Sequence, residues 1–364
     1  MSDAPFPYGR IHNFSAGPAV LPLSVVEELR EQLPNFAGMG VGVMELSHRS
    51  KPFLKLMKGA QGRIRRLLNL SDEHTVLFLQ GGASLQFLMV AMNLLQGGTA
   101  DYIDTGVWAN KAIKEAKRYG TVVVPFSGKA ENYRQVPQAW ARTPGAVYTH
   151  ITTNNTIYGT QLHGLPESEG LLVADMSSDI LSREVDTSKI DVIYAGAQKN
   201  LGPSGLTVVT LSPRAMARAA LSDAPTMLNY KVHADDADQL YNTPNTFGVL
   251  ALDRVLNWIE TQGLHTVGET NRRKAQKIYD VLDSSAFWRP HAAADSRSDM
   301  NITWRLQDEA LEPVFVKEAT EAGLDGLKGH RSVGGLRASI YNACPEQSVD
   351  ALVAFMREFE RVRG

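Results

Sequence analysis

The chain has 364 residues, of which 43% are hydrophobic and 21% are charged, so it is long enough for a large hydrophobic core and for two domains. Its formal net charge of -2 excludes a broad electrostatic attraction to nucleic acid or to an anionic membrane, so an anion would have to be bound by a local cluster of residues. The single cysteine, Cys344, excludes an intramolecular disulfide and favours a reducing, cytoplasmic location, and the sequence shows neither a signal peptide nor a membrane span.

The N-terminal part of the chain predicts an arm followed by a short helix. Residues 1–22 are rich in proline, glycine and asparagine and are expected to be extended, with residues 1–15 forming an arm of the kind that often packs on a partner subunit. Ser24 and Glu27 have the spacing of a capping box, which predicts a helix N-terminus. The apolar positions that recur at helical spacing around this box are Leu23, Val26, Leu29 and Leu33.

A loop with two potential cations precedes a basic helix. His48 and Arg49 follow a glycine-rich stretch, and the residue types alone favour a solvated surface for this pair. Residues 51–70 combine basic and apolar positions at helical spacing, which predicts a helix with one buried face. The charged face is interpreted as solvated rather than as a nucleic-acid patch.

A glycine turn between a strand and a helix is a candidate anion site. The apolar run at residues 75–79 predicts a strand, and the turn GGAS at residues 81–84 leads into a helix. At a helix N-terminus the free backbone N–H groups and the helix dipole favour an anion, so Ala83 and Ser84 would donate to a phosphate. Trp108, at the start of a later helix, could stack on a flat ring, although a tryptophan is more often simply part of the core.

Two apolar runs further along each end in a polar residue. Residues 171–174 are followed by Asp175, and residues 192–197 are followed by Gln198 and Lys199. Both runs predict short buried strands, and ligands of open α/β sheets bind beyond the carboxyl ends of the strands. A lysine can bind an aldehyde cofactor covalently, and a carboxylate can keep a pyridine nitrogen protonated; pyridoxal 5'-phosphate (PLP) needs both. Glycines around the lysine would let such a ligand approach closely, whereas an arbitrary Asp and Lys would more often cap a turn and lie in solvent.

The order of the predicted elements indicates the fold class. Strands and helices alternate through residues 16–262, which predicts a large α/β domain with a mainly parallel sheet flanked by helices. Residues 263–364 change character and predict a smaller C-terminal α+β domain. Further strands are expected at 121–125, 146–151, 206–211, 301–306 and 336–341, and helices at 109–119, 248–262, 312–322 and 349–362.

A glycine-bracketed stretch in the C-terminal domain is a second candidate anion site. Residues 329–337 contain His330, Arg331 and Arg337 between glycines. Arginine and histidine side chains in a glycine-rich loop can converge on one anion, so this stretch predicts an anion site.

Several long motifs, in the same order along the chain, resemble one known family. YAGAQKNLGPSGLT around Lys199, with VADMSSDILSR before it, resembles the cofactor-lysine region of phosphoserine aminotransferases, which are class V, fold type I PLP enzymes. The resemblance runs from NFSAGPAVLP at residues 13–22 to GHRSVGGLRASIYNA at residues 329–343. It implies conversion of 3-phosphohydroxypyruvate and glutamate to phosphoserine and 2-oxoglutarate in serine synthesis. It leaves open whether the chain also acts on 3-hydroxy-2-oxo-4-phosphobutanoate in vitamin B6 synthesis.

The resemblance also implies roles for the matching residues. Lys199 would bind PLP and transfer the proton, and Asp175 would stabilise the protonated ring nitrogen. Arg337 is assigned to the α-carboxylate of the substrate, because a guanidinium fork matches a carboxylate in two hydrogen bonds. Some relatives carry an arginine at the position of Ser84, so its contribution must here be absent or replaced by another residue. The substrate's phosphate is assigned to His48, Arg49, His330 and Arg331. The remaining contacts are to the cofactor: Ala83 and Ser84 at the cofactor's phosphate, Trp108 over its ring, Thr156 near its phenolic oxygen, and Gln198. The resemblance also implies a homodimer in which Asn242 and Thr243 contact the cofactor of the partner subunit.

Two other functions remain to be weighed. A cysteine desulfurase-like lyase would share the fold and the cofactor but needs a nucleophilic cysteine in a mobile loop, and Cys344 follows an apparent strand. A non-enzymatic PLP-binding regulator would need a DNA-binding or interaction segment, which the near-neutral chain does not offer. No metal site is predicted.

Overall fold

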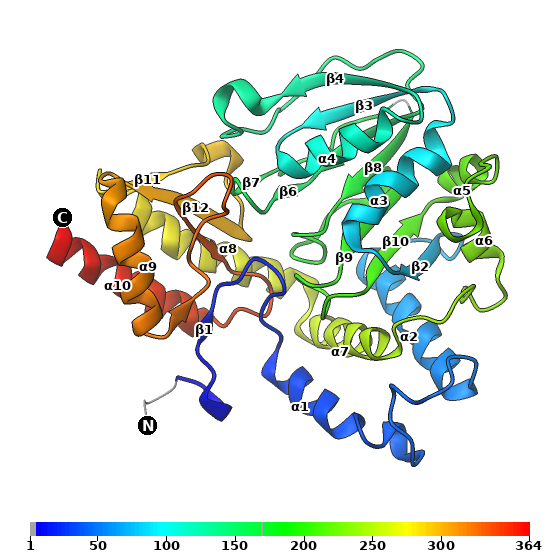
Figure 1. The fold of residues 1–364 in the computed structure, drawn as a ribbon, viewed down its shortest axis with the longest axis horizontal. Coiled ribbons are helices and arrows are strands. Elements are labelled where there is room, and N and C mark those ends of the chain that lie inside the picture. Colours follow the sequence, from blue (N-terminus) through cyan, green and yellow to red (C-terminus); the bar gives the residue numbers. More distant parts are fainter. Residues whose placement is uncertain (1–4, 169) are drawn as a thin grey trace.

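The computed structural model describes residues 5–168 and 170–364, and its larger part is built on a seven-stranded sheet (Figure 1). The strand order is β2-β10-β9-β8-β5-β3-β4. All neighbouring strands are parallel except at β10, which runs antiparallel to both β2 and β9. The predicted α/β class with a mainly parallel sheet is therefore confirmed. The seven strands are β2 (Thr75–Leu79), β3 (Thr99–Asp104), β4 (Thr121–Ser127), β5 (Tyr148–Thr152), β8 (Leu171–Asp175), β9 (Val192–Gly196) and β10 (Thr207–Leu211).

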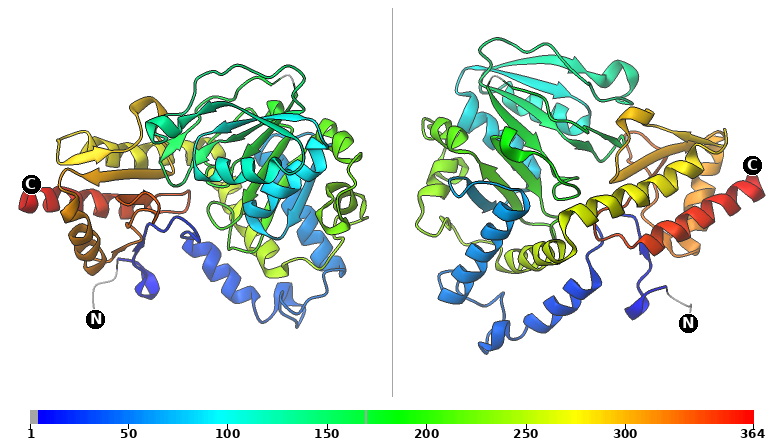
Figure 2. Two further views of the ribbon diagram at one scale, coloured as in Figure 1. Left: turned by 45° about the horizontal axis from the view of Figure 1, so that its top comes forward. Right: turned by 180° about the vertical axis from the view of Figure 1, so that it is seen from behind.

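Helices cover both faces of this sheet (Figure 2). Because side chains alternate along a strand, β2 directs Leu77 into one apolar layer and Phe78 into the other. The layer that contains Leu77 packs on α3, α4 and α5, and the layer that contains Phe78 packs on α2 and α7. β8 and β9 are buried along their whole length, as expected for strands covered on both faces. These helices and their neighbour α6 are α2 (Lys51–Leu67), α3 (Gly82–Val90), α4 (Val107–Ala116), α5 (Pro213–Ala219), α6 (Tyr230–Asp235) and α7 (Thr246–Gln262).

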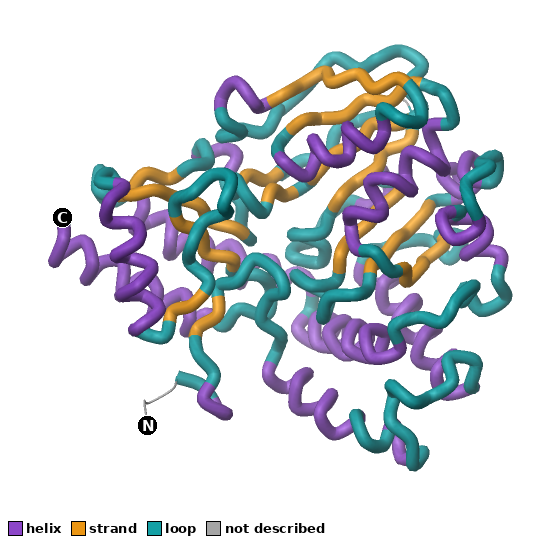
Figure 3. Tube along the Cα trace, in the orientation of Figure 1, coloured by secondary structure: helices purple, strands orange, loops and turns teal. Residues whose placement is uncertain are grey.

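A smaller antiparallel sheet, in the order β11-β12-β14, forms the C-terminal part of the molecule with three helices (Figure 3). Its core includes Trp304 and Phe315, together with Phe14 from the N-terminal segment, which is fully buried there. β1 pairs in parallel with β13 of the same chain, so the described part of the predicted arm packs on its own C-terminal elements, and residues 1–4 lie outside the described residues. These elements are β1 (His12–Asn13), β11 (Trp288–Pro290), β12 (Asn301–Leu306), β13 (Leu324–Asp325), β14 (Leu336–Ser339), α8 (Leu264–Leu282), α9 (Glu312–Glu321) and α10 (Glu346–Arg363).

The division into domains at residues 16–262 and 263–364 stays a prediction. Gly263, with φ of 79°, lies between the end of α7 and the start of α8. α8 itself was not expected from the sequence. None of the described helices combines the length and the hydropathy that crossing a bilayer requires.

Helix α1 (Leu23–Gln32) differs from its predicted form at its start and on its buried face. Pro22 precedes the helix and no side chain caps it, so the capping box predicted from Ser24 is wrong. Ser24 lies within the first turn because the helix begins one residue earlier. The helix packs on α7 and buries Val25, whereas Val26, which the predicted apolar face includes, is 38% exposed.

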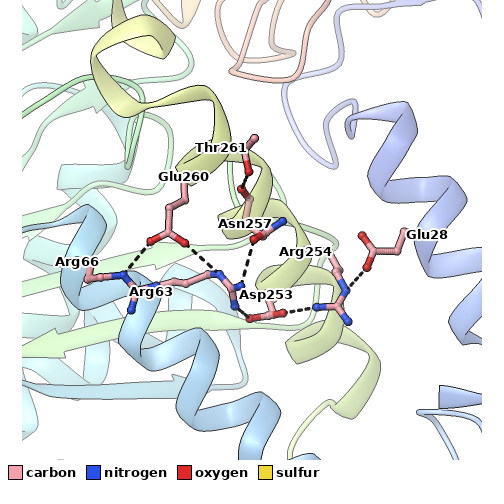
Figure 4. A network of polar contacts seen from close by, with 8 residues as sticks. All are labelled: Glu28, Arg63, Arg66, Asp253, Arg254, Asn257, Glu260 and Thr261. Carbon is pink, nitrogen blue, oxygen red and sulfur yellow. Dashed lines mark hydrogen bonds and ion pairs between the residues drawn. The ribbon is translucent and has the colours of Figure 1, made fainter. Parts of the chain in front are cut away.

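The charged face of α2 is largely exposed, as interpreted from the sequence, since Lys51, Lys55, Lys58 and Arg66 are all exposed, but part of it also forms ion pairs. Two of its arginines, Arg63 and Arg66, form ion pairs with α7 (Figure 4). Asp253 of α7 lies at the centre, since one carboxylate oxygen pairs with Arg63 of α2 and the other with Arg254. The network therefore joins α1 and α2 to α7, which lies far from both in the sequence. Its charged members are Glu28, Arg63, Arg66, Asp253, Arg254 and Glu260.

Replacing Asp253 by asparagine is expected to lower the free energy of unfolding by about 2 to 3 kcal/mol, because two arginines lose their shared partner. The loss stays below that of a fully buried pair, because the side chains of Arg63 and Arg254 are 23% and 22% exposed. Urea unfolding at one fixed protein concentration measures it. As a control, Lys231→Met breaks an exposed pair with Asp235 and should change stability by less than about 1 kcal/mol. Equal stability of Asp253→Asn and the parent protein would contradict the expectation.

Candidate active site

The carboxyl ends of β8 and β9 meet at one edge of the large sheet, where a cavity of about 520 Å³ opens. Asp175 is the last residue of β8, and Gln198 and Lys199 lie in the turn that follows β9. Because these strands are parallel neighbours, their ends bring Asp175 and Lys199 to one cavity. The predicted site residues that line it are Ala83, Ser84, Trp108, Thr156, Asp175, Gln198 and Lys199.

The Lys199 amine faces two side chains of this cavity. Its Nζ donates a hydrogen bond of 2.6 Å to Thr156 Oγ1 and lies 5.9 Å from the ring centroid of Trp108. Burial lowers the pKa of Lys199 to about 8, although the negative charge of Asp175 acts in the opposite direction. A larger fraction of the amine is therefore neutral near neutral pH than for an exposed lysine, and the neutral amine is the nucleophilic form.

Asp175 is a buried carboxyl group with few protein partners. It is 4% exposed, and its Oδ1 accepts the backbone N–H of Ser177 at 3.0 Å. Burial raises the pKa of Asp175, while the hydrogen bonds from Ser177 and the charge of Lys199 lower it. A cationic N–H group bound in the cavity would therefore stabilise the ionised carboxylate.

The N-terminus of α3 faces the same cavity. Gly81 precedes the helix with φ of 86°, a left-handed conformation that favours glycine, and a Cβ atom there would approach Leu85 to 2.6 Å. No side chain caps the helix, so the first backbone N–H groups remain available. With Ala83 and Ser84 in the cavity lining, this turn has the geometry of a phosphate site.

Two buried polar atoms of the lining have no hydrogen-bond partner among the described residues. They are Nε1 of Trp108 and Oγ1 of Thr152. Trp108 occupies the first turn of α4, and Lys111 Nζ lies 4.4 Å from its ring centroid. A buried polar atom without a partner is costly unless a ligand or water satisfies it. A lysine, a carboxylate, a helix N-terminus and an indole ring around one cavity fit PLP.

Thr156 and Arg337 connect this cavity to the smaller sheet. Thr156 follows β6 (Asn154–Asn155) in a hairpin with β7 (Thr160–Gln161). Arg337 of β14 donates from Nη1 to the backbone oxygen of Thr156 at 3.3 Å. Burial lowers the pKa of Arg337, and its buried Nε has no partner among the described residues, which leaves donor capacity for an anion.

The other predicted substrate and cofactor residues, Arg337 included, do not line the cavity of their own chain. His330 and Arg331 line a different cavity, of about 840 Å³, on the C-terminal part. Burial lowers the pKa of His330, and so do the positive charges of Arg337, Arg331 and Lys111, so these cations lie close enough to His330 to disfavour its protonated form. His48 and Arg49 lie in the loop before α2, and Asn242 and Thr243 in the loop before α7.

Sequence reasoning did not assign several residues of the cavity lining, among them Gly17, Pro18 and Ser177. The chain next to Pro18 is tied to the lysine turn, because the N–H of Ala19 donates to the backbone oxygen of Gln198 at 2.9 Å. Ser177 could have been found as a polar residue just after the β8 strand end. The only indication for Gly17 and Pro18 is that they belong to the NFSAGP motif, and this motif predicts an extended segment rather than part of the site.

Cys344 lacks the environment that a cysteine desulfurase needs. The side chain is 3% exposed, and burial raises the pKa of the thiol to about 11. Only the thiolate is a good nucleophile, so this cysteine is unreactive near neutral pH. The geometry disfavours the desulfurase alternative.

Comparison with known proteins identifies close relatives over nearly the whole chain. The family model described as Aminotransferase class-V matches residues 11–352. The chain is 52% identical, over 98% of its length and 99% of the relative's, to a phosphoserine aminotransferase of Desulfosudis oleivorans. The solved structure of phosphoserine aminotransferase from Bacillus circulans subsp. alkalophilus matches with a TM-score of 0.94 and 48% identity, covering 98% of this chain and 99% of that one. A PLP-bound phosphoserine aminotransferase from Trichomonas vaginalis matches with a TM-score of 0.91 and 35% identity, covering 96% and 100%.

Proposed function

The chain belongs to the class-V aminotransferase family, and we propose that it transfers the amino group of glutamate to 3-phosphohydroxypyruvate, which gives phosphoserine and 2-oxoglutarate in serine biosynthesis. The cofactor is PLP. One observation supports the proposal most strongly. The chain is 52% identical to a phosphoserine aminotransferase over almost its full length, and a lysine and a carboxylate line one cavity of its structure.

Lys199 and Asp175 have different roles in this reaction. When bound, PLP supplies an aldehyde that bonds to a lysine and a ring that takes up the electrons released at the substrate's α-carbon. Lys199 would hold PLP through that bond, and its amine would move the proton at the substrate's α-carbon. Its pKa of about 8 leaves part of the amine neutral near neutral pH, as a base requires. Asp175 holds the proton on the ring nitrogen, because a buried carboxylate is stabilised by a cationic N–H.

The rest of the cavity orients the cofactor. Ala83 and Ser84 donate backbone N–H groups to its phosphate at the start of α3. Trp108 covers the ring and excludes water from one of its faces. Thr156 binds near the phenolic oxygen, and its hydrogen bond with Lys199 supports this placement.

We further propose that the active site is shared in a homodimer located in the cytoplasm. His48, Arg49, Asn242 and Thr243 do not line the cavity of their own chain, so a second copy has to supply them if they bind substrate or cofactor. The phosphate of the substrate would then meet His48 and Arg49 of the partner subunit together with His330 and Arg331, which line a separate cavity but lie close enough to Arg337 for its charge to act on His330. Arg337 would bind the α-carboxylate through two hydrogen bonds. A cytoplasmic location agrees with the single, buried and unpaired cysteine.

Replacing Arg49 or Arg331 by alanine tests the substrate. Each charge-assisted hydrogen bond to a phosphate contributes roughly 1.5 to 3 kcal/mol, so kcat/KM for 3-phosphohydroxypyruvate should fall about ten- to a hundred-fold. Hydroxypyruvate, which lacks the phosphate, should react poorly with the parent enzyme and be little affected by either change. Arg361→Ala, in an exposed pair with Glu358, serves as the control. An equal loss with both substrates would refute recognition of the phosphate, and kinetics with 3-hydroxy-2-oxo-4-phosphobutanoate decide whether that substrate is also used.

Mixing two inactive chains tests the shared site. One chain carries Lys199→Ala, and the other carries Asn242→Ala with Thr243→Ala. If each site combines Lys199 of one chain with Asn242 and Thr243 of the other, a heterodimer has one site with both lesions and one intact site. Activity should then reappear on subunit exchange and approach a quarter of the parent value in an equal mixture. Absence of recovery, despite exchange shown by mass spectrometry, would exclude sharing.

A further inference from the structure

Lys274 of α8 is a fully buried lysine outside the cavity, and it has three hydrogen-bond acceptors. Its Nζ donates to the backbone oxygens of Ile340 at 3.0 Å, Tyr341 at 2.9 Å and Cys344 at 3.1 Å. An ammonium group has three protons, so all of them are used. Burying a charge is unfavourable unless its partners are well placed, so this group fixes the three carbonyls in one arrangement. Residues 340–344, which follow β14, are called the bracket below.

The bracket contacts the N-terminal loop that lines the cavity. The hydroxyl of Tyr341 donates to the backbone oxygen of Ala16 at 2.8 Å and accepts from Asn301 Nδ2 at 3.2 Å. Ala16 precedes Gly17 and Pro18, which line the cavity. Tyr341 is fully buried, so its ring has no freedom to leave these partners without moving the bracket.

The bracket also contacts the turn that carries Lys199. The backbone N–H of Asn342 donates to the side-chain oxygen of Asn200 at 3.1 Å, and Asn200 directly follows Lys199. The Asn342 side chain is held as well, since its oxygen accepts from Asn271 Nδ2 at 2.8 Å. Asn271 lies three residues before Lys274, so both residues project from the same face of α8 onto the bracket.

We propose that Lys274 is a positioning residue for the transamination: by fixing the bracket it holds Asn342 against Asn200 and thereby orients the turn that carries Lys199. The proposal rests on the proposed function, in which Lys199 transfers a proton. Small displacements of such a group have large effects on rate, because the reacting atoms must lie in near-attack geometry. A purely structural role for Lys274 would instead affect stability and leave the properties of Lys199 unchanged.

The first test replaces Lys274 by methionine, which has a similar length but cannot donate. The expected result is a fall in kcat of about 10- to 100-fold, with a smaller change in KM, and slower uptake of PLP by the apo-protein. Lys277→Met is the matched control, since Lys277 lies on the same helix and, in the part of the chain that the structure describes, pairs with Glu346 and Asp350 at the surface. Leu352→Ala, in the core of the C-terminal part, is the control for lost stability. If Leu352→Ala lowers kcat as much at an equal loss of Tm, the proposal is wrong.

A double-mutant cycle tests the route through Asn342. Lys274→Met and Asn200→Ala, which removes the side-chain oxygen that accepts the backbone N–H of Asn342, should each lower kcat. The double variant should have about the same kcat as the more damaged of the two single variants, because both changes remove the same restraint. Multiplied effects would overturn the proposed route.

Asn200→Ala removes the same contact on the side of the lysine turn. This test does not require that the Lys274→Met protein folds. It should lower kcat and shift the pH midpoint of the visible absorption of the bound cofactor in the same direction as Lys274→Met. An unchanged midpoint and kcat would overturn the proposal. The pH midpoint and the rate of PLP uptake are measured without substrate. If the parent protein fails to form phosphoserine, the proposed function is refuted, but these two measurements still test the role of Lys274.

Discussion

Replacing Lys199 by alanine is expected to remove the visible absorption band of the bound cofactor and to lower kcat by about 10⁴-fold or more. The reason is that one amine makes the covalent bond to PLP and also moves the proton at the α-carbon. Its Nζ lies in the cavity within 2.6 Å of Thr156 Oγ1, where a ligand can reach it. Absorption spectra and the steady-state rate of phosphoserine formation measure both effects.

Two controls accompany this variant. Lys189→Ala changes an exposed lysine and should keep both the absorption band and the rate. Adding methylamine to Lys199→Ala should restore a small part of the activity, because a free amine can bond to the cofactor and accept the proton. A Lys199→Ala protein with a rate near that of the parent would show that another residue has the assigned role.

Replacing Asp175 by asparagine should lower kcat by about 10²- to 10³-fold while PLP stays bound. The asparagine keeps the shape of the side chain but carries no charge, so the ring nitrogen loses the group that holds its proton. The carboxylate is 4% exposed, so water cannot replace its charge effectively. Binding should persist because the phosphate site at α3 and the Lys199 bond do not depend on Asp175. The measurements are kcat and the stoichiometry of bound PLP.

Asp179→Asn is the matched control for Asp175→Asn. Asp179 is also buried, and burial raises its pKa too, but it accepts hydrogen bonds from Thr153 and Gln161 and does not line the cavity. Its loss should reduce stability much more than kcat. If both variants lower kcat equally, the effect comes from the loss of any buried carboxylate in this region, and the assignment of Asp175 to the ring nitrogen is wrong.

Elements with a regular apolar pattern were predicted well, and those with an interrupted pattern were not. β8 and β9 follow from continuous apolar runs, and α7 ends at the glycine that the sequence indicates. α8 was missed although it has 19 residues. Its buried face contains Asn271 and Lys274, and polar residues at buried positions hide the helical period of the apolar ones.

Strand pairings between distant parts of the chain could not be predicted from the sequence either. β1 and β13 each have two residues and pair across more than 300 positions of the chain, and a two-residue strand has no detectable period. The ion pairs around Asp253 could not be predicted from the sequence for a related reason. A charged helix face shows that a helix is amphipathic, but the partner of each arginine depends on which helix packs beside it.

The sequence by itself determined the chemical centre of this protein. Asp175 and Lys199 each follow a local apolar run, and parallel neighbouring strands bring such ends to one edge of a sheet, so their meeting requires only the right topology. The tertiary structure alone decided what surrounds them. Asn200 contacts Asn342, and Lys274 contacts the carbonyls of the bracket, because α8 packs against the bracket and the bracket packs against the lysine turn. No local pattern encodes these contacts, since their geometry arises only when separately formed elements pack together.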